Sequence, residues 1–88
     1  MPTISLFYGI SIYMYWEEHG VPHLHAIRAD EAAVFSIQTG EIIVGSMSRR
    51  ARKRVSAWIR QRREALLDNW RRGRDGLPFD QVPGPDDE

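Results

Sequence analysis

The chain has 88 residues, of which 42% are hydrophobic and 27% are charged, a balance typical of one small folded domain. It contains no cysteine, which excludes disulfides, thiolate metal sites and thiol catalysis. No apolar run reaches the roughly 18 residues of a membrane span, and the first residues lack the basic segment of a signal peptide, so we expect a cytoplasmic protein.

The formal net charge of zero conceals three segments of different charge. Residues 1–48 carry one basic and five acidic residues, which gives −4, and residues 49–75 carry eleven basic and three acidic residues, which gives +8. Residues 76–88 carry four acidic residues and no basic one, which gives −4. The middle segment is suited to an anionic partner, and the last segment could screen it.

Alternation of large and polar residues predicts four strands in the first half of the chain. The first runs from Ile4 to Trp16 with a bend at Gly9, and the second spans residues 23–29. A tight turn at Asp30-Glu31 leads into a third strand, and a fourth follows it; they span residues 32–38 and 41–45. Such short connections favour an antiparallel meander.

From residue 49 the apolar period becomes helical. Ser48 is a suitable N-cap, because its hydroxyl can accept from a free N–H of the first turn, and Gly73 is a natural stop. Arg62 interrupts the apolar stripe, and we expect its stem to lie along the core while its head reaches solvent. One helix from Arg49 to about Arg72 is predicted, with these residues on its buried face: Ala51, Val55, Trp58, Ile59 and Leu66.

The predicted fold class is α+β, a four-stranded antiparallel meander sheet with one long C-terminal helix packed on one face. Residues 1–79 form a single domain. Residues 80–88 form a flexible acidic tail, because prolines and glycines break any regular pattern there. The sheet face under the helix is expected to carry the apolar members of the alternation: Ile10, Ile12, Met14, Trp16, Leu24, Ala26, Ala33, Phe35 and Ile37.

The three histidines lie within seven residues of one another, at His19, His23 and His25. His23 and His25 are two apart on a strand, so both side chains project from the same face. We expect this to be the face away from the helix, where Tyr13 and Tyr15 also lie. Clustered titratable groups of this kind favour a functional site.

Three interpretations of the histidine pair stay open. The pair is structural and hydrogen-bonded to a tyrosine, or it performs acid–base or phosphate-contacting work. In the third interpretation it binds zinc or nickel, and Glu17 or Glu18 would have to complete the ligand set. We predict no metal ligand and no cofactor; His23, His25 and Tyr15 are the candidate catalytic residues.

Basic residues gather on one side of the predicted helix. Guanidinium groups match phosphate oxygens, and bases near a helix N-terminus oppose the helix dipole, which suggests that their charge serves another purpose. Docking of an acidic protein and a simple solvated face are the alternatives. The predicted nucleic-acid-binding residues are Arg49, Arg50, Lys53, Arg60 and Arg63.

Three short motifs resemble the signature of a bacterial family of small proteins, the domain of unknown function 4160. They are Phe7-Tyr8-Gly9-Ile10, Met14-Tyr15 and Pro22-His23-Leu24-His25. The resemblance extends through Arg49-Arg50-Ala51 and the stretch 66–70, so it covers about residues 1–72.

This sequence departs from the family pattern at two positions. Val21 stands where the family commonly has a first proline, and Glu18 stands where it has an aspartate. The resemblance implies no established activity. It does imply membership of two-gene modules of a toxin–antitoxin type, with a cognate partner protein.

The function we expect is that of a small cytoplasmic protein that interacts with nucleic acid, RNA more than DNA, in a toxin–antitoxin-like module. In its sharpest form the chain is a ribonuclease-type toxin in which His23 and His25 exchange protons with a phosphodiester. Whether the chain is an enzyme stays open. The alternative is a non-enzymatic interaction module that uses the basic helix or the histidine face. A homodimer also stays open, and no membrane partner is expected.

Overall fold

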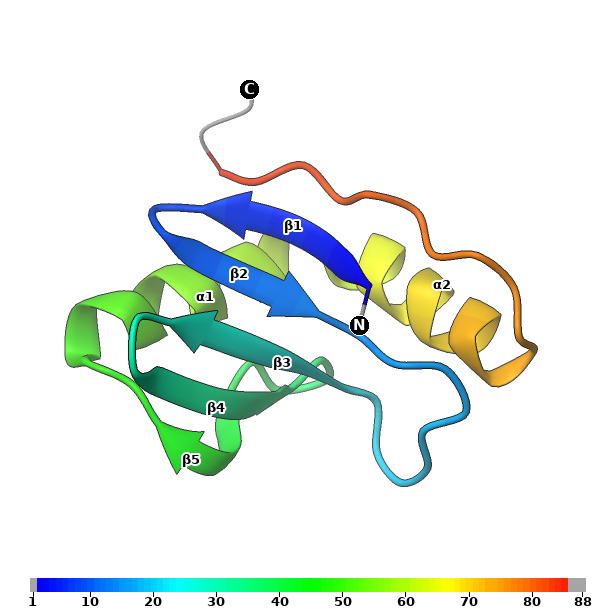
Figure 1. Cartoon of the computed structure of the whole chain (residues 1–88), viewed down its shortest axis with the longest axis horizontal. Coiled ribbons are helices and arrows are strands. Elements are labelled where there is room, and N and C mark those ends of the chain that lie inside the picture. Colours follow the sequence, from blue (N-terminus) through cyan, green and yellow to red (C-terminus); the bar gives the residue numbers. More distant parts are fainter. Residues whose placement is uncertain (1, 86–88) are drawn as a thin grey trace.

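In the computed structural model, which describes residues 2–85, five strands form one antiparallel sheet in the order β1-β2-β3-β4-β5. Both helices follow the strands in the chain and cover one side of the sheet (Figure 1). The strands are β1 (Thr3–Phe7), β2 (Ile10–Tyr13), β3 (His23–Arg28), β4 (Glu31–Ser36) and β5 (Ile42–Ser46), and the helices are α1 (Arg49–Gln61) and α2 (Arg63–Arg74). The predicted α+β class and antiparallel sheet are confirmed; the counts of four strands and one helix are wrong.

The predicted first strand is a hairpin of two strands. Phe7 pairs with Ile10, and the two residues between them, Tyr8 and Gly9, have φ of 53° and 74°. Two successive positive φ angles are typical of a type I′ turn, whose twist matches that of the flanking strands. The chain therefore reverses at Gly9 instead of bending, and the sheet gains a strand.

The predicted single helix is interrupted at Arg62, whose φ of −111° and ψ of 20° depart from helical values. The apolar stripe continues across this break, since Ile59 and Leu66 are both buried, and the sequence period alone could not reveal it. The expected N-cap is confirmed, because the Ser48 hydroxyl accepts from the backbone N–H of Ala51 at 3.3 Å. No helix within residues 2–85 combines the length and apolar character needed to cross a bilayer.

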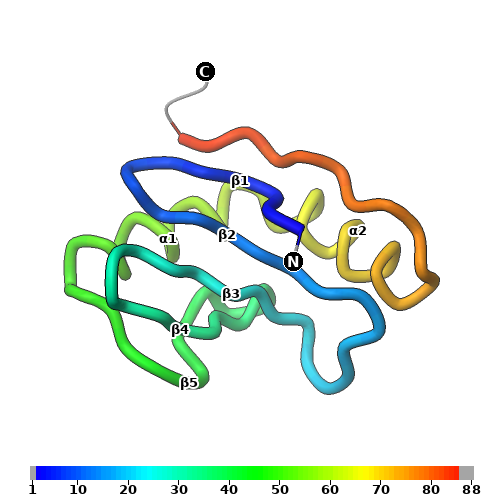
Figure 2. Tube along the Cα trace, in the orientation of Figure 1, coloured from blue at the N-terminus to red at the C-terminus, as the bar shows by residue number. Residues whose placement is uncertain are grey.

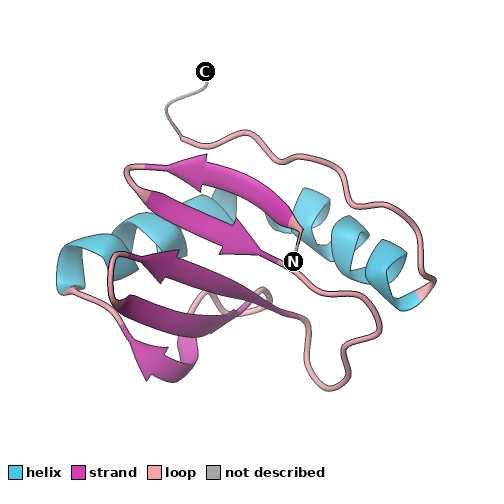
Figure 3. Cartoon of the chain, viewed as in Figure 1, coloured by secondary structure: helices cyan, strands magenta, loops and turns pink. Residues whose placement is uncertain are grey.

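The core lies between the sheet and the two helices (Figure 3). Every apolar side chain predicted for the helix-covered face is buried except Trp16, which is 47% exposed. Trp16 follows the end of β2, stacks on Phe79 with ring centroids 5.0 Å apart, and donates to the carbonyl of Leu77. Phe7 packs against Trp58 at 4.8 Å, so β1 also contributes to this core.

The segment after α2 runs back beside β1 (Figure 2). Val82 is buried, and its N–H donates to the carbonyl of Ile4 at 2.9 Å. The indole of Trp58 donates to the carbonyl of Pro83 at 2.8 Å. Residues 80–85, which the sequence analysis placed in a flexible tail, therefore include the contacts that cover this edge of the sheet. The acidic end at residues 86–88 lies outside the described residues.

Candidate functional site

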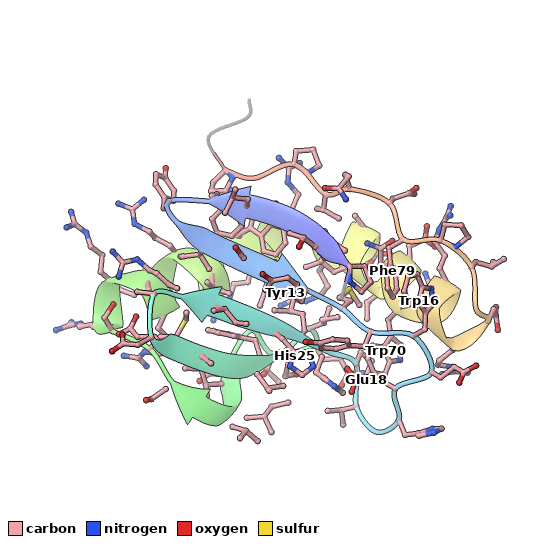
Figure 4. All side chains as sticks on the ribbon, in the orientation of Figure 1. Tyr13, Trp16, Glu18, His25, Trp70 and Phe79 are labelled. Carbon is pink, nitrogen blue, oxygen red and sulfur yellow. The ribbon has the colours of Figure 1, made fainter. Side chains whose placement is uncertain are left out.

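Glu18, His23 and His25 converge at the end of the sheet where β3 begins, and we call them the Glu–His–His cluster. Figure 4 shows Glu18 and His25 side by side at this end. The two histidines occupy alternate positions of β3, so their side chains project together. Glu18 returns to them from the loop between β2 and β3. In that loop Glu17 has a φ of 60° and donates its backbone N–H to the carbonyl of Gly73 at 3.1 Å.

One carboxylate oxygen joins the cluster. Oε1 of Glu18 lies 3.0 Å from Nε2 of His23 and 3.0 Å from Nε2 of His25. Nδ1 of His23 lies 2.8 Å from the carbonyl oxygen of Val21. A carbonyl oxygen only accepts, so Nδ1 carries the proton and donates it to Val21. Nε2 then faces the carboxylate, and this contact is favourable when a second proton or a metal cation lies between the two atoms.

Aromatic side chains hold both imidazole rings. Tyr15 packs edge-on against His25 with ring centroids 4.6 Å apart, and Trp70 packs against His23 at 4.9 Å. The side chains of His23, His25 and Glu18 are 13%, 26% and 28% exposed, so a small ligand can reach them from solvent. The rings are therefore oriented by their surroundings and still accessible.

The three predicted catalytic residues, His23, His25 and Tyr15, lie together at this cluster. Their geometry is poorly suited to a two-histidine proton relay on a phosphodiester, because both ring nitrogens of His23 already have partners. Sequence reasoning named Glu17 and Glu18 as alternative carboxylate partners without deciding between them, and it did not place Trp70 at the site. The spacing of Glu18 before the histidine pair was visible, but its position depends on the path of the intervening loop.

A second site, which we call the basic pocket, opens where β3 ends and α1 begins. The guanidinium carbon of Arg54 lies 3.7 Å from the centre of the Tyr8 ring, and Tyr8 as a whole residue is 47% exposed. The cavity has a volume of about 320 Å³ and is lined by Tyr8, Ile10, Arg28, Ser48, Arg50, Ala51 and Arg54.

The predicted nucleic-acid-binding residues are not all at this pocket. Arg49, Arg50 and Lys53 are exposed in the first two turns of α1, and Arg50 lines the cavity. Arg60 is exposed in the last turn of that helix. Arg63 belongs to α2, and its Nε donates to the carbonyl of Ile37 at 3.0 Å, so part of its donor capacity is used within the fold.

The two sites lie at opposite ends of β3, which begins at His23 and ends at Arg28. Five residues of strand span about 16 Å. A small ligand bound at one site therefore does not touch the other. Sequence reasoning missed Tyr8, Arg28 and Arg54, because a turn residue, a strand end and a helix residue become neighbours only in the folded chain.

These features define a small α+β protein with a partly exposed Glu–His–His cluster and a separate basic pocket. The chain belongs to the family described as Domain of unknown function (DUF4160), whose model matches residues 9–71. The match confirms the resemblance and includes the whole Glu–His–His cluster together with α1. No curated protein and no solved structure matches the chain.

Proposed function

We propose that the protein binds single-stranded nucleic acid, RNA more than DNA, at the basic pocket and the adjoining turns of α1. The observation that carries this proposal is the cation–π pair of Arg54 and exposed Tyr8 in a cavity that also holds Arg28 and Arg50. Guanidinium groups bind phosphate oxygens, and unpaired bases stack on tyrosine rings and guanidinium planes.

The charge of this part of the chain supports the same proposal. The first turn of α1 contains no acidic residue, so Arg49 and Arg50 have no neutralising partner from that turn. The free backbone N–H groups at a helix N-terminus also favour an anion. The backbone N–H of Ser48 already donates to the Glu31 carboxylate and that of Ala51 to the Ser48 hydroxyl. A phosphate at this end of the helix would therefore be held mainly by the guanidinium groups of Arg49 and Arg50.

The proposal concerns binding and does not include phosphodiester cleavage by the histidine pair, because the basic pocket and the Glu–His–His cluster are at opposite ends of β3. The likeness to toxin–antitoxin modules fits a small nucleic-acid-binding chain with a cognate partner protein. We extend the proposal to such a module on the strength of that resemblance.

Fluorescence anisotropy with a labelled oligoribonucleotide tests the proposal. The wild type should bind at low salt, and three phosphate contacts give a slope of log K against log salt of about −2. Replacing Arg49 and Arg50 by Glu should weaken binding at least about 10-fold. The matched control replaces Arg71 and Arg74, exposed bases of α2, by Glu; the charge change is equal, so a long-range effect of net charge would appear in both variants.

Tyr8→Asn separates stacking from charge. Asn-Gly is a favoured type I′ turn, so the hairpin between Phe7 and Ile10 should be retained. Loss of one base stack is worth about 1–3 kcal/mol, so affinity should fall about 5- to 150-fold. Absence of binding by the wild type at low salt, or equal losses in both pairs of arginine variants, would refute binding at this pocket.

Protein–protein interaction is a second candidate, favoured by the free edge of the sheet at β5. The opposite edge at β1 is covered by residues 81–82, whereas Ile43 and Val44 on β5 are 48% and 62% exposed. Antiparallel edges can pair with a second copy of the same strand, which gives a symmetric dimer. Sedimentation equilibrium should then show a dimer that Val44→Lys dissociates, whereas a wild-type monomer at high concentration rules it out.

A further inference from the structure

We propose that the Glu–His–His cluster binds one divalent transition-metal ion, and we commit to zinc. This goes beyond nucleic-acid binding and departs from the sequence-based expectation of no metal. It concerns atoms that the basic pocket does not share. Within residues 2–85, Glu18, His23 and His25 are the group of potential ligands whose donor atoms all lie within 4.8 Å of one another.

Two of the three separations between the ligand atoms fit a bound ion. Two ligands held about 2.1 Å from zinc at angles of 90–110° lie about 3.0–3.4 Å apart. Oε1 of Glu18 lies 3.0 Å from Nε2 of each histidine. The third separation, between the two histidine nitrogens, is within 4.8 Å. Rotation of these side chains would bring the three atoms around one ion without rearrangement of β3.

The hydrogen bond from His23 to Val21 prepares this histidine as a ligand. Metal-bound histidines commonly donate their second ring N–H to a carbonyl or carboxylate, which fixes the tautomer and the ring orientation. Nδ1 of His23 donates to the Val21 carbonyl at 2.8 Å, so Nε2 is the ring nitrogen that faces Glu18. A cation between these two atoms would take the place of a shared proton and form a coordination bond to each.

The ligand types select the class of ion. Two imidazole nitrogens and one carboxylate oxygen suit zinc and similar transition ions, whereas calcium and magnesium require more oxygen ligands. Thiolate, the ligand that favours copper(I), is absent from a chain without cysteine. Three protein ligands leave a fourth tetrahedral position for water or for a donor atom of a small molecule.

Isothermal titration of the full chain with zinc chloride, after removal of metal by chelator and dialysis, tests the site. The wild type should bind one equivalent with a Kd in the micromolar range or tighter. Glu18→Gln, His23→Gln and His25→Gln should each weaken binding at least about 10-fold. Glu17→Gln and His19→Gln are matched controls from the same loop, outside the cluster, and should bind zinc as the wild type does.

Two further measurements keep the test decisive. Circular dichroism shows whether each variant is folded. If a histidine variant unfolds, the wild type is titrated with zinc and its imidazole NMR signals are followed. Signals of His23 and His25 should shift to saturation at one equivalent, ahead of His19. Binding that is far weaker than micromolar, or loss of affinity that is equal in the control variants, would overturn the proposal.

The zinc proposal and the nucleic-acid proposal can be tested independently of each other. The variant with Arg49→Glu and Arg50→Glu should bind zinc with wild-type affinity, because Arg49 and Arg50 lie at the other end of the sheet from the Glu–His–His cluster. A protein that binds zinc but no RNA overturns only the nucleic-acid proposal, and the reverse result overturns only the zinc site.

Discussion

Gly45 is the position at which a single side chain would most directly disturb the sheet. Its φ is 84°, and an added Cβ would overlap the carbonyl oxygen of Ala32 on the neighbouring strand. Positive φ alone costs a non-glycine residue about 1–3 kcal/mol, and the backbone of β4 cannot move away without losing its pairing with β3.

Gly45→Ala should therefore lower the free energy of unfolding by at least about 3 kcal/mol. Gly76→Ala is the matched control, since Gly76 has a φ of 71° but an added Cβ there meets open space; about 1 kcal/mol is expected. Urea denaturation of both variants measures the difference. Equal losses would show that the overlap with Ala32 does not matter.

His25 is expected to matter more to zinc binding than to folding. Its side chain is 26% exposed, and Gln can keep a hydrogen bond to Glu18. We expect His25→Gln to lower the free energy of unfolding by less than about 1 kcal/mol, as measured by urea denaturation. A variant that fails to fold would make His25 a structural residue.

The candidate sites were only partly predictable from residue types. Alternation along one strand was enough to place His23 and His25 on one face, and the tyrosine beside them was identified. The carboxylate partner was left open between Glu17 and Glu18. That choice depends on a positive φ at Glu17 and on a backbone hydrogen bond to Gly73, 56 positions away in the chain, which no local pattern reports.

At the scale of elements, the buried faces of the strands were predicted well because their period is local. Ile12, Leu24 and Phe35 are each fully buried, as their alternation indicated. The breaks were predicted less well. The sequence pattern predicts a bend at Gly9 and not the observed Tyr8-Gly9 hairpin, because the residues on both sides continue one strand-like pattern. The helix break at Arg62 was hidden because the apolar stripe passes through it.

The segment after α2 is held by Asn69, a buried polar residue that sequence reasoning did not single out. Its side-chain amide donates to the carbonyl of Asp80, and its side-chain oxygen accepts from the N–H of Asp80, both at 2.9 Å. These two bonds replace the hydrogen bonds that a strand partner would supply. They explain how a segment rich in proline and glycine keeps a fixed path.

Asn69→Ala should lower the free energy of unfolding by about 2 kcal/mol, because it leaves the backbone groups of Asp80 without these partners. It should also make the segment that follows residue 76 more susceptible to proteolysis. The control is Asp68→Ala, at the adjacent exposed position, where the ion pairs with Arg71 and Arg72 are solvent-exposed and worth little. If both variants are equally stable, the Asn69–Asp80 pair does not anchor this segment.

At the scale of the whole molecule, we expect the core to form without metal. Its largest fully buried side chains include Trp58, Phe7 and Phe35. They lie between the sheet and the helices, and none of them belongs to the Glu–His–His cluster. Protein stripped of metal by chelator should therefore remain folded and unfold in one cooperative thermal transition. Zinc at 100 times its Kd should stabilise the fold by about 2.7 kcal/mol.

Differential scanning calorimetry with and without chelator, and then with added zinc, measures both effects. Loss of the cooperative transition after removal of metal would make the cluster a structural metal site that the fold requires. Zinc that leaves the midpoint of the wild type unchanged at saturating concentration would contradict specific binding to the folded state.

For the whole molecule, we expect nucleic acid to bind at the basic pocket and not at the Glu–His–His cluster. The most direct test is a ¹H–¹⁵N correlation spectrum of the protein titrated with a short oligoribonucleotide at low salt. We predict that the largest shifts fall on the Tyr8-Gly9 turn, Arg28 and residues 48–54, with little change at His23 and His25. Absence of shifts, or shifts centred on the start of β3, would contradict nucleic-acid binding at the basic pocket.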